Sequence, residues 1–324
     1  MQPSVLVTGA SGFLGHALVE RLTLAHLPVR IATRRPPLPI FHDVEQVLVP
    51  DLALPVDWDP LLADIDAVVH CAARVHVMHD AAANPLDAFR RINVEATMNL
   101  ARQASLRGVR RFVFVSSIKV NGESTGLHQP FTAEDPADPV DPYGISKHEA
   151  ELGLRRLAAQ TGMEVVIVRP VLVYGPGVKG NFLSMMRWVQ RGIPLPLGAV
   201  HNQRSLVALD NLVDLISLCL HHPAAANQTF LVSDDDDLST TVLLRRTASA
   251  LALPSRLVPV PVPAMRAALT VVGKGDAANR LFGSLQVDIA KTRAVLGWAP
   301  VVTLDEGLRR AAEHFLANPN DGLR

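Results

Sequence analysis

Short apolar runs alternate with stretches of helical length through the first half of the chain. The apolar runs predict strands at residues 4–7, 28–33, 67–73, 112–116 and 165–169. The stretches between them predict helices at residues 13–25, 85–107 and 142–159. Such alternation is typical of βαβ units, so we expect an α/β fold with a doubly wound parallel sheet. Its ligand should lie outside the carboxyl ends of the strands.

The pattern changes after the segment Tyr174-Gly175-Pro176-Gly177, where proline becomes more frequent and strands become rarer. Helices are predicted at 181–190, 209–220, 239–251, 287–296 and 304–315, with short strands at 205–208 and 229–232. The apolar stretch 258–272, broken by prolines, is interpreted as a packed helix, with an interfacial or dimer-contact surface as the alternative. We therefore expect a dinucleotide-binding domain at 1–174 and 203–232. A smaller, mostly helical C-terminal substrate domain should comprise 175–202 and 233–324.

Composition and charge narrow the class of protein. The chain has 324 residues, 48% of them hydrophobic, which is enough for a sizeable core. Lysine plus arginine equals aspartate plus glutamate at 31 each, so no overall basic field favours nucleic acid. The two cysteines lie in apolar runs and form no disulfide framework. The first strand follows Met1 closely and no apolar run is long enough to span a membrane. We expect a cytoplasmic protein without membrane insertion.

Three glycines follow the first predicted strand and open the first predicted helix. Gly9 allows a sharp turn, Gly12 allows backbone N–H groups to approach a pyrophosphate, and Gly15 allows close packing of the helix. The phosphates would then lie at a helix N-terminus, where unpaired N–H groups and the helix dipole favour negative charge. A plain flexible turn is the alternative, but the flanking strand and helix favour dinucleotide binding.

Tyr143 and Lys147 lie four residues apart at the start of a predicted helix, so their side chains share one face. An ammonium group beside a phenol stabilises the phenolate and lowers its pKa, which suits proton transfer at an alcohol or carbonyl. Ser117 closes a strand at the same sheet edge and could donate a hydrogen bond to a substrate oxygen. An exposed helical pair and a strand-end serine cap are the structural alternatives.

Two further patterns suggest sites. The second strand runs into Arg34 with no acidic residue nearby, so the pocket should accept the 2′-phosphate of NADP(H), with an exposed basic turn as the alternative. The four aspartates at 234–237 are interpreted as a solvated turn and helix cap. No histidine or cysteine has the spacing of a metal site, so we expect no metal.

The motifs in order resemble those of the extended short-chain dehydrogenase/reductases, the NAD-dependent epimerase/dehydratase family with a Rossmann-type sheet. The segments that carry the resemblance are 8–15, Asp51-Leu52, 70–73, 93–97, Ser116-Ser117, 143–147, 169–177, 204–211 and 296–300. Agreement in order and spacing covers most of the chain.

The resemblance implies roles for individual residues. Ser117, Tyr143 and Lys147 would be catalytic. The cofactor would be held by Gly9, Ser11, Gly12, Phe13, Leu14, Gly15, Arg34, Asp51, Leu52, Ala72, Ala73, Asn93, Tyr143, Lys147 and Pro170. The substrate would be contacted by His76, Ser117, Tyr143, Asn181, Arg204 and Arg280, with the two arginines and Asn181 on its diphosphate.

The resemblance also implies a nicotinamide-dependent enzyme acting at C4 of a UDP-sugar in surface polysaccharide synthesis. Ser117-Ile118-Lys119 replaces the threonine and acidic residues typical of 4,6-dehydratases, and Asn121 stands where epimerases usually carry an aromatic residue. We therefore expect a 4-reductase of a UDP-4-keto-6-deoxy-N-acetylhexosamine, using NADPH in preference to NADH. The alternatives are a UDP-hexose 4-epimerase and a non-catalytic dinucleotide-sensing regulator. A homodimer through helices at 89–104 and 142–159 is implied by the family.

Overall fold

A seven-stranded parallel sheet forms the centre of the computed structural model, which describes residues 3–34, 41, 44–75, 84–271, 273 and 275–319. The strand order is β3-β2-β1-β4-β5-β6-β9. The strands are β1 (Val5–Thr8), β2 (Val29–Thr33), β3 (Glu45–Leu48), β4 (Ala67–His70), β5 (Arg111–Val115), β6 (Glu164–Pro170) and β9 (Thr229–Val232). The order reverses beside β1, at the point where doubly wound sheets bind dinucleotides. The predicted α/β class is confirmed.

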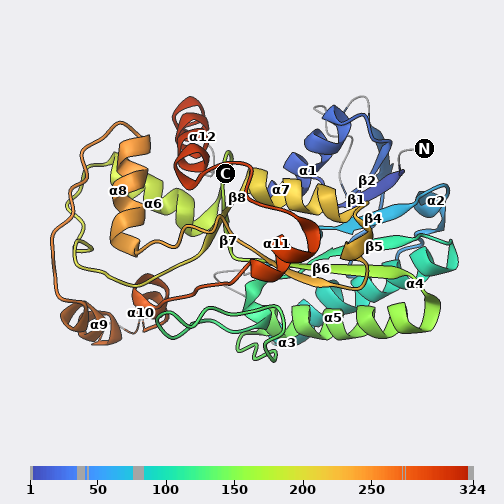
Figure 1. Ribbon diagram of the computed structural model, residues 1–324, viewed down its shortest axis with the longest axis horizontal. Coiled ribbons are helices and arrows are strands. Elements are labelled where there is room, and N and C mark those ends of the chain that lie inside the picture. Colours follow the sequence, from blue (N-terminus) through green and yellow to red (C-terminus); the bar gives the residue numbers. More distant parts are fainter. Residues whose placement is uncertain are drawn as a thin grey trace.

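Helices cover both faces of the sheet (Figure 1). One apolar cluster joins β1 and β4 to α1 (Phe13–Leu24), α7 (Leu209–Cys219) and α11 (Ala290–Leu296). A second cluster joins the opposite face to α2 (Asp59–Leu62), α4 (Ala96–Leu106) and α5 (Pro142–Thr161). Side chains alternate between these clusters along each strand: Val5 and Val7 enter the first, and Leu6 enters the second.

The segment predicted as one helix at 85–107 is interrupted in the structure. It comprises α3 (Pro85–Arg90), a single π-turn η2 (Arg91–Glu95) and α4. A π-turn inserts an extra residue into the helical ladder and is common at functional sites. Here it turns the Asn93 side chain into the interior, where Asn93 is 1% exposed.

The C-terminal elements pack around a separate apolar cluster on the left of Figure 1. Its helices are α6 (Gly180–Gln190), α8 (Thr240–Ala250), α9 (Val262–Val271), α10 (Gly275–Phe282) and α12 (Leu304–Ala317). A two-stranded parallel sheet of β7 (Leu172–Tyr174) and β8 (Leu206–Ala208) joins this cluster to the main sheet. Short 3-10 turns are η3 (Ile118–Val120) and η4 (Pro223–Ala225). The domain boundaries predicted from the sequence stay a prediction.

One expectation for the C-terminal part is wrong. Asp234 does not lie in a solvated turn: it is 9% exposed and accepts hydrogen bonds from Tyr174 Oη at 2.7 Å and Asn211 Nδ2 at 2.7 Å. The helix cap is Ser239, whose hydroxyl accepts from Val242 N. The stretch expected as a packed helix forms α9, which packs on the C-terminal cluster through buried Met265 and partly buried Val262 and Leu269.

Within the described residues, no helix combines the length and apolarity needed to cross a bilayer. The same residues contain no group of three or more histidine, cysteine, aspartate or glutamate side chains arranged to hold a metal ion.

Candidate active site

The turn between β1 and α1 has space only for glycine at two positions. Gly9 has φ +75°, and a Cβ built there would lie 2.7 Å from the backbone N of Ala72. A Cβ on Gly15 would lie 2.2 Å from the carbonyl oxygen of Gly9. Both contacts are with backbone, so a larger residue would force β1, β4 and α1 apart.

The turn fits the pyrophosphate of a dinucleotide. Gly12 is the N-cap of α1, has no capping side chain, and is followed by a first turn without acidic residues. Ser11 and Gly12 are exposed, while Phe13 and Leu14 are half-buried against the core. The N–H groups at this helix terminus are therefore open to an anion, and the missing Cβ of Gly12 leaves room for its close approach.

Ser117, Tyr143 and Lys147 come together at the carboxyl edge of β5. The Ser117 side chain lies close enough to the Tyr143 phenol to lower its pKa. Lys147 lies one helical turn further along α5, with Nζ 6.0 Å from the Tyr143 ring centroid. The helix begins here because Asp141 caps it, accepting from Gly144 N at 2.7 Å, and because Pro142 needs no N–H partner in the first turn.

The protonation of this group differs from the expectation. Burial and the nearby charge of Asp141 raise the pKa of Tyr143 to about 12, although the nearby Ser117 side chain opposes the shift. Burial also lowers the pKa of Lys147 to about 8. The lowering of the tyrosine pKa that was predicted from Lys147 is therefore not found, because burial of the phenol and the charge of Asp141 raise this pKa.

A directed chain of buried hydrogen bonds begins at the loop beyond β4. Burial lowers the pKa of His70 to about 3, so the ring is neutral. Thr97 Oγ1 donates to Asn93 O at 2.8 Å and so accepts from His70 Nε2 at 2.9 Å. His70 Nδ1 must then accept from Thr8 Oγ1 at 2.7 Å, and Thr8 Oγ1 accepts from Ala72 N at 3.4 Å. Each hydroxyl and ring nitrogen in this hydrogen-bond chain is thus fixed as a donor or as an acceptor.

Asn93 extends this hydrogen-bond chain to Tyr143. Its Oδ1 accepts from Arg74 N at 2.8 Å, and its Nδ2 donates to Arg74 O at 3.0 Å and Ser146 Oγ at 2.9 Å. Ser146 Oγ in turn donates to the Tyr143 carbonyl at 2.8 Å. Because both amide donors of Asn93 are taken, its side chain fixes the loop at 71–74 to helix α5. Contact of Asn93 with a cofactor stays a prediction.

A buried ion pair supports the strand ends beneath Ser117. Glu151 is fully buried and accepts from Arg169 Nε at 2.9 Å and Ser116 Oγ at 2.6 Å. Arg169 also donates to Asn121 Oδ1 at 2.9 Å. Sequence reasoning missed Glu151, although its position four residues after Lys147 on the same helix face was a usable signal.

The other predicted cofactor residues lie along the same sheet edge. Arg34 and Asp51 follow β2 and β3, and Arg34 Nη1 lies 3.5 Å from Asp51 Oδ2 in an exposed ion pair. Leu52, Ala72 and Ala73 are half-buried, and Pro170 is buried at the end of β6. Contact of these residues with a cofactor stays a prediction.

The predicted substrate residues lie on the C-terminal elements. Arg204 donates through Nη1 to Gly283 O at 3.1 Å, and burial lowers its pKa. Among the described residues it has no carboxylate partner, so its partly buried charge is not balanced by an ion pair there. Asn181 is exposed on the first turn of α6. Arg280 lies on α10 with a side chain outside the described atoms, and His76 lies outside the described residues.

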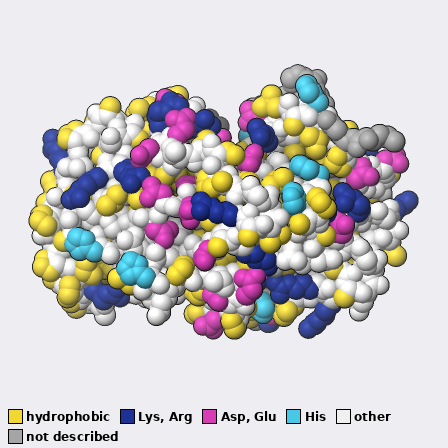
Figure 2. Space-filling model, viewed as in Figure 1, with side chains coloured by type: hydrophobic (Ala, Val, Ile, Leu, Met, Phe, Trp, Pro, Cys, Tyr) yellow, Lys and Arg dark blue, Asp and Glu magenta, His cyan; other side chains and the backbone are white. Residues whose placement is uncertain are grey.

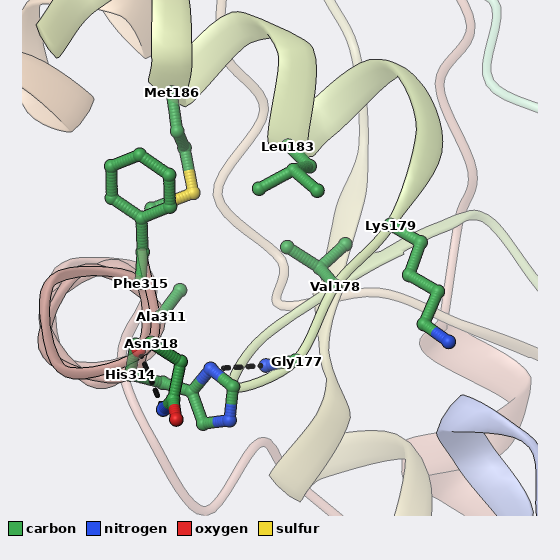
Figure 3. Close-up of a pocket in the computed structure, with 9 residues that line it drawn as sticks. All are labelled: Gly177, Val178, Lys179, Leu183, Met186, Ala311, His314, Phe315 and Asn318. Carbon is green, nitrogen blue, oxygen red and sulfur yellow. Dashed lines mark hydrogen bonds between the residues drawn. The ribbon is translucent and has the colours of Figure 1, made fainter. Parts of the chain in front are cut away.

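A small cavity of about 30 Å³ lies between α6 and α12, apart from these residues (Figure 3). Figure 3 shows His314 pointing at Gly177, whose N–H donates to His314 Nδ1 at 3.2 Å. Lys179 points away from the apolar side chains of Leu183 and Phe315. The cavity is lined mainly by side chains of α6 and α12 where these two helices pack together. Its His314 anchors the loop that leads from β7 to α6.

The model of the NAD dependent epimerase/dehydratase family matches residues 5–233. The chain belongs to this family. The resemblance stated from the sequence is thereby confirmed, together with the expectation that the protein is an enzyme with a nicotinamide cofactor.

The similarity to individual relatives extends over nearly the whole of this chain. The chain is 48% identical to the UDP-glucose 4-epimerase of Vibrio cholerae, covering 99% of this chain and 98% of the relative. It is 27% identical to the N-acetyl-alpha-D-glucosaminyl-diphospho-ditrans,octacis-undecaprenol 4-epimerase of Escherichia coli O157:H7, covering 97% and 96%. Among solved structures, MoeE5 in complex with UDP-glucose and NAD matches with TM-score 0.76 and 25% identity, covering 98% and 99%.

Proposed function

We propose that this protein is a UDP-hexose 4-epimerase that keeps its NAD bound. The observation that carries the proposal is the 48% identity to a UDP-glucose 4-epimerase across nearly all of both chains. The site agrees with it, because a serine, a tyrosine and a lysine converge where the sheet binds a dinucleotide. The 4-reductase expected from the sequence is not confirmed, and the epimerase alternative is better supported.

Tyr143 acts as the base and acid at the C4 oxygen. It accepts the C4 hydroxyl proton as hydride leaves C4, and it returns that proton once hydride has been restored to the other face. When bound, the nicotinamide supplies the acceptor and then the donor of the hydride. Ser117, which lies close to Tyr143, holds the same sugar oxygen. Lys147 is the cation that can lower the tyrosine pKa when proton acceptance is required.

Asn121 no longer counts against an epimerase. It is 2% exposed, and its amide accepts from Arg169 at 2.9 Å and donates to Thr132 O at 2.9 Å. These contacts give the residue a role in the fold beneath the site. Its departure from the aromatic pattern therefore has a structural reason that is independent of the reaction.

The UDP moiety is assigned to the C-terminal elements. Arg204 supplies a buried guanidinium, whose planar fork suits a diphosphate, and Asn181 and Arg280 are proposed as further contacts. The hexose is glucose or its N-acetylated analogue. The NADPH preference predicted from Arg34 is kept as a separate proposal, and the Asp51 carboxylate beside Arg34 supports a pocket that also accepts NAD.

The test separates the two reactions by their need for reductant. The purified protein is incubated with UDP-glucose or UDP-N-acetylglucosamine and no added reductant, and separately with a UDP-4-keto-6-deoxy-N-acetylhexosamine plus NADPH. We expect the C4 epimer in the first mixtures and no steady cofactor oxidation in the last. The reverse result would restore the reductase, and turnover in none of them would favour a dinucleotide-sensing regulator.

A further inference from the structure

An exposed apolar surface flanked by arginines lies at the end of the C-terminal lobe farthest from the main sheet (Figure 1). We call it the α9 surface. Its members are the exposed residues Ile193, Arg256, Val258, Pro263, Ala264, Arg266, Ala267, Ala268 and Val271. Val271 is 87% exposed and Ile193 is 53% exposed, so large apolar side chains contact water here.

Backbone pairing holds this surface in place. Leu195 N donates to Arg256 O at 2.9 Å, and Val258 N donates to Leu195 O at 2.8 Å. The segments around residues 193 and 258 therefore lie side by side and lead into α9. Because Met265 alone of α9 is buried, the helix presents most of its alanine, valine and proline side chains outward. A contiguous exposed apolar face of this kind is typical of a surface that contacts a partner or a membrane.

The surface is basic in a chain with no net charge. The sequence has no aspartate or glutamate between Glu164 and Asp210, or between Asp237 and Asp276. Arg256 donates to Gly192 O and Arg266 to Asn279 Oδ1, and in the part of the chain that is described neither forms an ion pair. Figure 2 shows apolar and basic side chains along this left edge, while acidic ones gather nearer the middle.

We propose that the α9 surface docks on an anionic phospholipid membrane. An apolar helix face with arginines at its border lies in the headgroup region of such a surface, and the arginines attract its negative lipids. A second copy of this chain fits less well, because it would bring the same arginines together without carboxylates. The proposal goes beyond the proposed function and does not depend on it.

Docking would bring one side of the candidate site close to the membrane. Helix α9 packs on α10, where the Arg266 guanidinium lies 5.9 Å from the Phe282 ring centroid. Gly283, directly after α10, holds Arg204 through its carbonyl oxygen. The proposed diphosphate contacts are thus linked to the lipid-facing helix by one packed layer.

The test is flotation of the full chain with vesicles of phosphatidylcholine alone or mixed equally with phosphatidylglycerol. We expect binding only to the mixed vesicles, weakened by salt because the attraction is screened. Val271→Asp and the double variant Arg256→Glu/Arg266→Glu should each weaken binding by about tenfold or more. Turnover of soluble substrate should be unchanged in both.

Matched controls lie on α1, away from the α9 surface (Figure 1). Leu24 is 72% exposed and Arg21 is exposed, so Leu24→Asp and Arg21→Glu make the same changes elsewhere. We expect both controls to bind like the wild type. Absence of binding to mixed vesicles, or equal loss in the controls, would overturn the proposal. Self-association that Val271→Asp abolishes, without lipid binding, would assign the surface to a second copy.

Discussion

The ε-ammonium of Lys147 donates a hydrogen bond to the carbonyl oxygen of Val115 at 2.8 Å, in a site that leaves Lys147 1% exposed. The same nitrogen lies 4.4 Å from the Phe114 ring centroid. These contacts stabilise the ammonium, but they do not replace its lost hydration, so the pKa falls to about 8. Keeping the Lys147 ammonium buried at the candidate active site therefore lowers the free energy of unfolding.

Replacing Lys147 by methionine should remove a pH dependence of stability. Below about pH 8 the lysine is charged in both states. From there to its unfolded pKa of about 10.4 the unfolded chain binds more protons, so the free energy of unfolding rises with pH. Urea unfolding of wild type and Lys147→Met from about pH 7 to about pH 9.5 measures this difference.

Lys119→Met is the matched control for that series. Burial acts to lower the pKa of Lys119, but the hydrogen bond and charge of Asp141, with Glu123, raise it above its usual value. Its contribution to stability is therefore constant over the same pH range. If the free energy of unfolding of the wild type and of Lys147→Met changed with pH in parallel, the lowered pKa of Lys147 would be contradicted.

Removing the Tyr143 hydroxyl should lower the rate of the reaction and leave ligand binding nearly unchanged. We expect Tyr143→Phe to lower kcat by about 10²- to 10⁴-fold, because the proton donor is lost while most of the contact area remains. Tyr174→Phe is the control, since that hydroxyl donates to Asp234 at 2.7 Å and should affect stability more than rate. Near wild-type turnover in Tyr143→Phe would refute the role of the tyrosine.

His70 should remain neutral with its proton on Nε2. Its burial lowers the pKa to about 3, and its two threonine partners fix the tautomer. The ring nitrogen shifts in a ¹⁵N NMR experiment should therefore not change from about pH 5 to pH 8, the range in which exposed histidines titrate. Titration of His70 in that range, or a proton on Nδ1, would break the chain inferred between Ala72 and Tyr143.

The main sheet could be predicted because its signals are local. Apolar runs separated by helical stretches predicted the strands, and the glycines at 9 and 15 stand where the backbone leaves no space for a Cβ. The π-turn around Asn93 could not be predicted in the same way, because one extra residue in a single turn is too short an interruption to disturb the apolar pattern of the long helical segment.

Contacts between residues far apart in the sequence could not be predicted from it either. Asp234 was expected in solvent because it begins an acidic run, but Tyr174 lies 60 residues earlier and supplies its partner. The tyrosine pKa was expected to fall because Lys147 is close in sequence, whereas the degree of burial that raises it depends on tertiary packing. Spacing thus identified which side chains meet, but not how much water remains around them.

Arg204 should contribute strongly to UDP binding. Removing one partner of a buried charge pair costs about 2–5 kcal/mol, so Arg204→Ala should weaken UDP affinity by that amount in calorimetry. Arg191→Ala is the control, because Arg191 is an exposed arginine on the same lobe. If both variants bind UDP as tightly as the wild type, the diphosphate lies elsewhere.

The central claim is that hydride leaves C4 and returns to the same sugar. UDP-glucose carrying deuterium at C4 is incubated with the purified protein without added reductant, and the UDP-galactose formed is analysed by NMR and mass spectrometry. The account predicts that the epimer appears with deuterium retained at C4, in many turnovers per bound NAD. Failure to form the epimer, or an epimer that has lost its C4 deuterium, would contradict it.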